Sequence, residues 1–273
     1  MTEMDVTLRG AAAIRQVFQR RKESGGKVLI PYIMAADPDL GTTEKIVRSL
    51  SGIDVDVIEL GMPFSDPLAD GPVIQLASER ALKQGLTLTL LLKSIKNMRV
   101  YVDTPIVIMT YYNLFLQYGL EKFATDAAQA GVDGLIVPDM PPEESAELHQ
   151  ALEKENLALI YLAAPTSTDK RIKTIADLTN GFIYYVSRTG VTGEQANIAD
   201  DLAANLQRIK KITDKPVAVG FGISNPEQAC DVAQHADGVV IGSAIVRLIA
   251  ETRELHDRIC AKFLKPYIDA LHQ

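Results

Sequence analysis

Short apolar runs alternate along the chain with segments in which apolar residues recur every three or four positions. The runs are apolar on both faces, which is typical of strands buried within a parallel sheet. The periodic segments are typical of amphipathic helices. The pattern predicts eight strands, at residues 28–34, 57–60, 105–110, 134–137, 158–162, 182–186, 217–221 and 238–241.

Each predicted strand is followed by helical sequence, and a further helix at 11–23 precedes the first strand. Eight such units favour an α/β fold of the closed (β/α)8 TIM-barrel type, with a doubly wound open sheet as the alternative. The helix at 11–23 is expected to cap the bottom of the barrel. No linker or low-complexity tract divides the chain, so residues 1–273 are expected to form a single domain. The predicted helices are 42–50, 72–84, 88–100, 120–130, 143–155, 169–178, 199–212 and 226–234, with helical sequence from the last strand to near the C-terminus.

A weak internal repeat also favours the barrel. Asp56, Asp133 and Asp237 each lie just before a predicted strand. An acid that recurs at one point of several strand–helix units indicates that these units are alike in structure.

Composition and charge limit the kinds of partner that the chain could bind and indicate the cellular compartment in which it acts. The chain is 47% hydrophobic and 23% charged with a net charge of −7, which is ordinary for a globular protein with a sizeable core. The negative charge argues against nucleic acid or an acidic membrane face as a partner. No apolar run is long enough to span a bilayer, and the first residues show no signal peptide. Because Cys230 and Cys260 make no disulfide framework, a reducing compartment such as the cytoplasm is expected.

Two acidic residues, one within the second predicted strand and one in the loop that follows it, are the leading candidates for catalysis. Glu59 stands among apolar residues at the strand end, whereas Asp70 lies in the polar loop that follows. A carboxylate buried among apolar groups is costly unless it is paired, neutralised or used in catalysis, and burial raises its pKa toward the range of a general acid–base catalyst. Two simpler interpretations stay open: Glu59 could form a buried ion pair, and Asp70 could cap a helix that begins near Pro72.

Catalytic groups of a (β/α)8 barrel lie at the C-terminal ends of its strands and in the loops that follow. Polar candidates at these ends are Thr110, Tyr111, Tyr112 and Asn113 after the third strand and Tyr184 in the sixth. No lysine lies at a predicted strand end, so a Schiff-base mechanism has no candidate amine. Histidines and cysteines do not cluster in the sequence, so no metal site is expected.

Glycine-rich loops follow the last three predicted strands and indicate an anion site. Glycines let backbone N–H groups approach an anion closely, and a helix that begins at Ser243 would point its positive N-terminal dipole at the same site. Barrels commonly bind a phosphate there, so we expect a phosphorylated small molecule as substrate. The glycine-rich segments are 187–193, 220–224 and 241–246.

The segment from Ile58 to Pro72 resembles the signature of the tryptophan synthase alpha chain family. Other matching motifs follow in the expected order over nearly the whole chain, so the set is specific although each motif alone is weak. These motifs are Ile30-Pro31-Tyr32 to Asp37-Pro38, Tyr111-Tyr112-Asn113, Pro138-Asp139-Met140-Pro141 with Glu143-Glu144, Ala164-Pro165-Thr166, and the segments 187–193, 220–224 and 241–246.

The resemblance implies a barrel that cleaves indole-3-glycerol phosphate into indole and glyceraldehyde 3-phosphate by a retro-aldol reaction. By the family pattern, Glu59 matches the carboxylate that moves the protons, Asp70 the carboxylate that faces the indole N–H, and Tyr184 a tyrosine beside the active site. The phosphate-binding positions match Gly193, Gly222, Gly242 and Ser243. The indole-pocket positions match Tyr32, Met109, Thr192 and Phe221, with Tyr32 where Phe is familiar and Met109 where Leu is.

The resemblance also implies an α2β2 heterotetramer with a tryptophan synthase beta chain, which carries pyridoxal phosphate and receives the indole. No cofactor is expected in this chain itself. Two alternatives stay open, a stand-alone lyase that needs no partner and a non-catalytic regulatory subunit, although the intact Glu59 and Asp70 disfavour the second. The expected location is the cytoplasm, or the plastid stroma if the chain is plastid-encoded.

Overall fold

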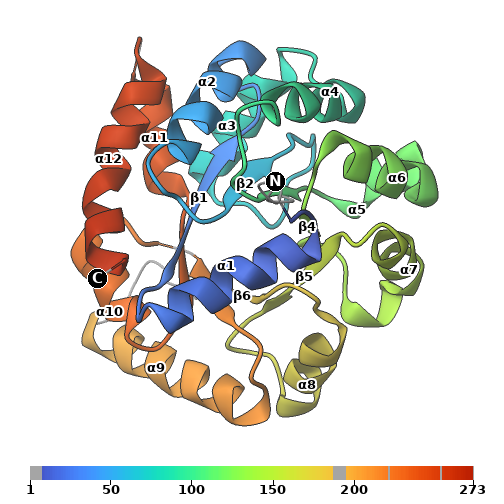
Figure 1. Cartoon of the computed structure of the whole chain (residues 1–273). Coiled ribbons are helices and arrows are strands. Elements are labelled where there is room, and N and C mark those ends of the chain that lie inside the picture. The colour runs from blue at the N-terminus through green and yellow to red at the C-terminus, as the bar shows by residue number, and fades with distance from the viewer. Residues whose placement is uncertain (1–7, 187–194, 221, 253, 273) are drawn as a thin grey trace, which may run out of the picture.

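Eight parallel strands close into a barrel in the order of the sequence, which confirms the predicted fold (Figure 1). The computed structural model describes residues 8–186, 195–220, 222–252 and 254–272. The strands are completely or almost completely buried, as their two-sided apolar pattern requires. They are β1 (Val28–Met34), β2 (Ile58–Gly61), β3 (Ile106–Met109), β4 (Gly134–Ile136), β5 (Ala158–Ala163), β6 (Ile183–Val186), β7 (Val217–Gly220) and β8 (Gly238–Ile241).

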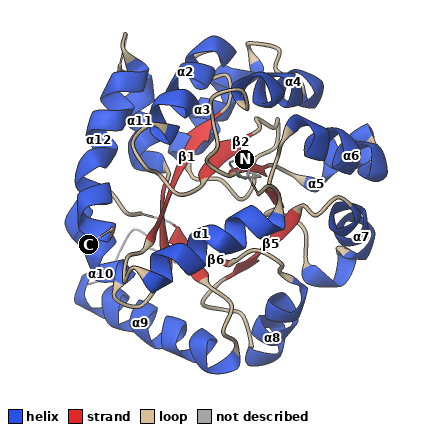
Figure 2. Ribbon diagram, in the orientation of Figure 1, coloured by secondary structure: helices blue, strands red, loops and turns tan. Residues whose placement is uncertain are grey.

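Helices surround the barrel and bury their apolar faces against the strands (Figure 2). The predicted helices are present with shifted ends. Their bounds are α2 (Leu40–Ser51), α3 (Pro72–Leu82), α4 (Leu88–Met98), α6 (Leu120–Ala130), α7 (Ala146–Lys154), α8 (Asp169–Leu178), α9 (Gln195–Ile212), α10 (Pro226–Ala233), α11 (Ser243–Glu251) and α12 (His256–Leu271).

Three segments differ from the prediction. A short helix, α5 (Tyr112–Tyr118), was not predicted; it follows β3 and is separated from α6 by Gly119 at φ 92°. The helix predicted at 143–155 starts as a 3-10 turn, η1 (Pro142–Glu144), before α7 begins. The C-terminal helical sequence divides into α11 and α12 at a break that includes Leu255 in the left-handed region.

Helix α1 (Ala11–Glu23) crosses the N-terminal mouth of the barrel, as predicted (Figure 1, dark blue). Phe18 packs on Phe182, which lies just before β6, with ring centroids 5.2 Å apart. At the start of the helix, the Gly10 N–H donates to Asp133 Oδ1 at 2.7 Å. The bottom of the barrel is therefore closed by α1, and a substrate must enter at the opposite mouth.

The repeated acids before strands tie neighbouring strands together at the N-terminal mouth. Each carboxylate accepts a hydrogen bond from a backbone N–H of the preceding strand. Asn180, before β6, does the same with its amide oxygen, so the repeat occurs before every even-numbered strand. The pairs are Leu29 N to Asp56 Oδ2 at 2.9 Å, Ile106 N to Asp133 Oδ2 at 2.8 Å, Leu159 N to Asn180 Oδ1 at 2.8 Å and Val217 N to Asp237 Oδ2 at 2.9 Å.

Candidate active site

Two acids and two tyrosines meet at the C-terminal mouth of the barrel. Tyr32 on β1 and Glu59 on β2 are register partners on adjacent strands. Asp70 ends the loop after β2, and Tyr184 comes from β6 on the far side of the barrel. Burial first, and then the charges of Glu59 and Asp70, raise the pKa of both tyrosines well above its ordinary value. The four side chains therefore lie within electrostatic reach of one another.

Glu59 is a buried carboxyl group whose two oxygens have no hydrogen-bond partner among the described residues. Burial, and then the charge of Asp70, raise its pKa to about 8. At neutral pH it is therefore mostly protonated and can act as an acid. Among the described residues, no basic side chain bonds to Glu59, which disfavours the buried-ion-pair interpretation.

Asp70 is half-buried and does not cap a helix. The N-cap of α3 is Gly71, which makes no side-chain capping bond, and the Asp70 carbonyl accepts from Gln75 Nε2 at 2.9 Å. Burial raises the pKa of Asp70 to about 6, although a hydrogen bond from Tyr111 opposes this shift. The carboxylate is therefore still mostly ionised at neutral pH, but it sits closer to its titration point than a loop carboxylate in water would.

Glycines make room for the two tyrosine rings. A Cβ atom on Gly61 would lie 2.6 Å from Tyr32 Cζ, and one on Gly220 would lie 2.7 Å from Tyr184 Cε1. Both distances are too short for a real contact, so any larger residue would displace a ring. Because the raised pKa keeps both hydroxyls protonated at neutral pH, Tyr32 and Tyr184 can donate hydrogen bonds but cannot serve as bases there.

The loops after β7 and β8 present backbone N–H groups at the same mouth. Gly242 is the N-cap of α11 and makes no side-chain capping bond, and Ser243, the first residue of the helix, is exposed. The first N–H groups of a helix have no partners within it, so this end can bind an anion. Gly222, after β7, has φ 79° and is exposed. These features are consistent with the predicted phosphate site.

Three predicted site residues, Gly193, Thr192 and Phe221, lie outside the described residues, as does the loop 187–193. Of the predicted pocket residues that are described, Tyr32 is buried against Gly61. Met109 ends β3 half-buried, and its carbonyl accepts from Met62 N at 2.9 Å. Tyr32 and Met109 thus lie on two neighbours of β2, the strand that carries Glu59.

Tyr111 is a site residue that the prediction left without a role. Its hydroxyl accepts from Ala69 N at 2.9 Å, next to Asp70 in the chain, and it lowers the pKa of the Asp70 carboxyl group against the effect of burial. Its ring stacks on Phe64 with centroids 5.0 Å apart. The position of Tyr111 directly after a strand end was visible in the sequence, but the loop partner of its hydroxyl was not.

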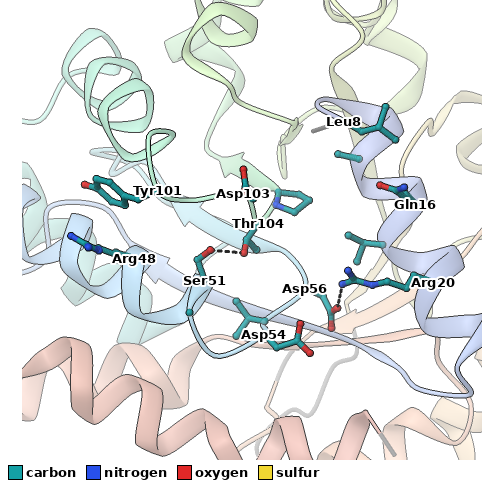
Figure 3. A pocket seen from close by; sticks show the side chains of 15 residues that line it. Leu8, Gln16, Arg20, Arg48, Ser51, Asp54, Asp56, Tyr101, Asp103 and Thr104 are labelled. Carbon is teal, nitrogen blue, oxygen red and sulfur yellow. Dashed lines mark hydrogen bonds and ion pairs between the residues drawn. The ribbon is translucent and has the colours of Figure 1, made fainter. Parts of the chain in front are cut away.

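A hollow of about 760 Å³ lies at the other mouth, between α1 and the segments before β2 and β3 (Figure 3). Its three carboxylates are all paired with arginines, at N–O distances of 2.9, 2.6 and 3.2 Å: Asp54 and Asp56 with Arg21, and Asp103 with Arg9. Ser51 and Thr104 bond each other at 2.9 Å. With no unpaired acid, this hollow does not offer the acid–base chemistry of the opposite mouth.

The described part of the chain contains neither a candidate metal centre nor a membrane-spanning helix. Within the described ranges, no group of three or more His, Cys, Asp or Glu side chains is placed to hold a metal ion. No helix in the described part of the chain is long and apolar enough to cross a bilayer. Cys230 and Cys260 are both free.

Comparison with known proteins gives a consistent result over almost the whole chain. A family model described as "Tryptophan synthase alpha chain" matches residues 18–268. The tryptophan synthase alpha chain of Geobacter sp. (strain M21) is 53% identical over 230 residues, 84% of this chain and 86% of that protein. That of Geotalea uraniireducens is 48% identical over 248 residues, 90% of this chain and 93% of that protein.

Solved structures agree with this result. The crystal structure of tryptophan synthase subunit alpha from Legionella pneumophila str. Paris superposes with a TM-score of 0.88 at 36% sequence identity, covering 95% of this chain and 98% of that one. The chain therefore belongs to the tryptophan synthase alpha chain family.

Proposed function

We propose that Glu59 and Asp70 carry the lyase reaction of this chain, the cleavage of indole-3-glycerol phosphate into indole and glyceraldehyde 3-phosphate. The observation that carries the assignment is the buried Glu59 carboxyl group, which has no hydrogen-bond partner and is opposed by the charge of Asp70. A buried polar group without a partner destabilises the fold, so its presence is best explained by a substrate that supplies the missing partner.

In the proposed mechanism, protonated Glu59 gives its proton to C3 of the indole ring, and positive charge develops on the ring nitrogen. Ionised Asp70 faces the indole N–H and stabilises that charge, an interaction that is stronger in the transition state than in the bound substrate. The substrate hydroxyl on the adjacent carbon then returns its proton to Glu59. The carbon–carbon bond breaks, its electron pair restores the aromatic ring, and the new carbonyl becomes the aldehyde of glyceraldehyde 3-phosphate.

The tyrosines and the last two loops bind and orient the substrate in this proposal. Tyr184 donates a hydrogen bond beside the reacting carbon atoms, and Tyr32 and Met109 line the indole pocket with Thr192 and Phe221. The phosphate binds to the backbone N–H groups of Gly222, Gly242 and Ser243 together with Gly193. The N-terminal dipole of α11 supports that placement.

We further propose that a tryptophan synthase beta chain docks over the C-terminal mouth in an α2β2 complex and receives the indole. Leu68, in the loop after β2, is 92% exposed, and Leu116 on α5 is 54% exposed. Both residues follow strand ends at the C-terminal mouth, so their apolar side chains are available to a partner that docks there. In this proposal pyridoxal phosphate belongs to the beta chain, because the proton transfers assigned here need carboxyl groups alone, and the complex acts in the cytoplasm.

The direct test is incubation with indole-3-glycerol phosphate and detection of free indole, with and without the beta chain. Cleavage that rises when the beta chain is added supports the proposal. Equal turnover in both conditions would favour the stand-alone lyase. No indole in either condition, from a chain that still activates the beta chain, would favour the regulatory subunit.

A further inference from the structure

We infer that Tyr111 is a positioning residue, which holds Asp70 and the loop that carries it in the geometry needed for catalysis. The inference rests on the function proposed above and deepens it. Tyr111 itself is not placed against the reacting atoms. It acts through Asp70, and its contacts with the loop are the reason for this assignment.

The loop between β2 and α3, residues 62–71, is held at its two ends by Met62, which bonds Met109 and Thr110, and by the Asp70 carbonyl, which accepts from Gln75. Two further attachments lie on either side of its exposed tip. Near its start, Ser78 of α3 binds both backbone groups of Phe64, donating to the carbonyl and accepting from the N–H, each at 3.0 Å. Near its end, the Tyr111 hydroxyl accepts from Ala69 N at 2.9 Å. The tip between these two places is exposed at Ser65, Asp66 and Leu68.

Tyr111 thus connects the end of the loop, at Ala69, to the barrel, whereas Ser78 connects its start, at Phe64, to a helix of the outer ring. Tyr111 directly follows Thr110, which is itself fixed, because its N–H donates to the Ile136 carbonyl of β4 at 3.2 Å and its hydroxyl to the Met62 carbonyl at 3.0 Å. The buried Tyr111 ring also stacks on Phe64 at an interplanar angle of 21°. One side chain therefore contacts both ends of the loop.

The hydrogen-bond pattern of the Tyr111 hydroxyl orients the Asp70 carboxylate. A phenol has one proton to donate, and here its oxygen already accepts from the Ala69 N–H. The proton is thus free to be donated toward the Asp70 carboxyl group, which follows Ala69 in the chain and whose pKa the Tyr111 hydroxyl lowers. A donor at this position favours the ionised form of Asp70, the form that the mechanism requires.

Other titratable groups lie near Asp70 or Tyr111 and interact with them electrostatically. Glu59 on β2, Tyr32 on β1 and Tyr184 on β6 interact with Asp70 through its charge. Asp139, after β4, acts on Tyr111 itself. All these groups are acids or phenols. Among them, Tyr111 is the group in the described part of the site that lowers the pKa of Asp70.

The test variant is Tyr111→Phe, which keeps the ring stacked on Phe64 and removes the hydroxyl. We expect kcat at neutral pH to fall roughly ten-fold, as for the loss of one hydrogen bond to a charged group. Without the donor, the pKa of Asp70 rises, so the acid limb of the kcat–pH profile moves up by about one pH unit. KM changes less than kcat, because the hydroxyl is not assigned to bind substrate.

The matched control is Tyr118→Phe. The Tyr118 hydroxyl also donates to an aspartate, Asp126 Oδ2 at 2.8 Å, but on the outer helices α5 and α6. This variant loses the same kind of bond and should keep the wild-type pH profile. A second probe, 3,5-difluorotyrosine at position 111, keeps the hydroxyl and makes it a stronger donor, so the acid limb should move in the opposite direction.

Carbon-13 NMR titration of the Asp70 carboxyl group, in protein without substrate, separates this inference from the proposed function. A wild-type chain that releases no indole would defeat the proposed function, while the NMR titration would still report the bond to Tyr111. An active wild type whose Asp70 titration and acid limb are unchanged by Tyr111→Phe would overturn the inference. A reduced kcat with an unmoved acid limb would also overturn it, because it would indicate a merely structural role.

Discussion

The charge of Asp70 raises the pKa of Glu59, although Glu59 lies within the buried strand β2 and Asp70 follows the exposed tip of the loop after it. The pKa of Asp70 is about 6 and that of Glu59 about 8. Between these values the pair holds one proton and one negative charge. Glu59 keeps the proton because it is buried and unpaired, and Asp70 keeps the charge because Tyr111 donates to it.

A bell-shaped pH dependence of kcat/KM follows from this division of roles, because the two pKa values are those of the protein without substrate. As pH falls through about 6, Asp70 becomes protonated and can no longer stabilise the positive ring. As pH rises through about 8, Glu59 loses the proton it must donate. The expected maximum lies between these two values. Initial rates of indole release in buffers of constant ionic strength test this, and a profile that is flat from about pH 5 to 9 would contradict the assignment.

Asp70→Asn tests the charge alone, because the amide has nearly the same size. We expect kcat to fall by about 10²-fold or more, the range for removal of one preorganised electrostatic group. The residual activity should lose its acid limb, and its alkaline limb should move to lower pH, because the charge that helps to raise the Glu59 pKa is gone. A variant with nearly full turnover would show that the charge of Asp70 is not needed.

Glu59→Gln should abolish indole release and, at alkaline pH, stabilise the fold. The folded-state pKa of about 8 lies above the ordinary value of 4.5. Between these two values the folded protein holds a proton that the unfolded chain has lost, so the wild-type free energy of unfolding decreases as pH rises, then levels off above about 8. Glutamine cannot lose a proton, so the variant should gain up to a few kcal/mol relative to wild type by about pH 9.

Urea unfolding at about pH 5, 7 and 9 measures this difference. The exposed Glu144→Gln serves as a control, for which the difference from wild type should not grow with pH. If Glu59→Gln were equally destabilised at all three pH values, Glu59 would have a structural partner instead of a buried, protonated carboxyl group.

The strands were predictable because all eight are apolar on both faces, whereas α5 was not predictable in this way. Its residues, Tyr112–Tyr118, follow a strand closely and end at Gly119, so the segment reads as a loop. Asn180 shows a similar limit. It takes the place of the repeated aspartate before β6, so the repeat of acidic residues is broken in the sequence. The structure shows that its amide oxygen accepts from Leu159 N, as the aspartates accept from the other strands.

The two acids were identifiable from their sequence surroundings, but their partners were not. Whether Asp70 capped α3 depended on which residue began the helix, and that residue is Pro72, with Gly71 as N-cap. The bond between Tyr111 and Asp70 joins two loops that follow different strands. Such a contact depends on how the barrel closes, and no local pattern encodes it.

Asp133 is expected to be one of the stability determinants of the N-terminal mouth. It is fully buried, accepts from the N–H groups of Gly10 and Ile106, and pairs with Arg99. Asp133→Ala leaves the largely buried Arg99 charge unpaired, so we expect a loss of about 3–5 kcal/mol in the free energy of unfolding. Asp103→Ala removes an exposed ion pair with Arg9 and should cost about 1 kcal/mol or less. Similar losses in the two variants, measured by urea unfolding, would contradict the prediction.

Leu68 tests where the beta chain docks. The side chain is 92% exposed, so Leu68→Asp should leave the free energy of unfolding almost unchanged. If the beta chain covers the C-terminal mouth, Leu68 becomes buried in the complex, and a charge there should weaken binding by about ten-fold or more. Val100→Asp is the matched control, because Val100 is 85% exposed but precedes β3 at the opposite mouth. Calorimetric titration with the beta chain measures both affinities. Equal weakening by the two variants would place the interface elsewhere, since a partner on the C-terminal mouth cannot contact Val100.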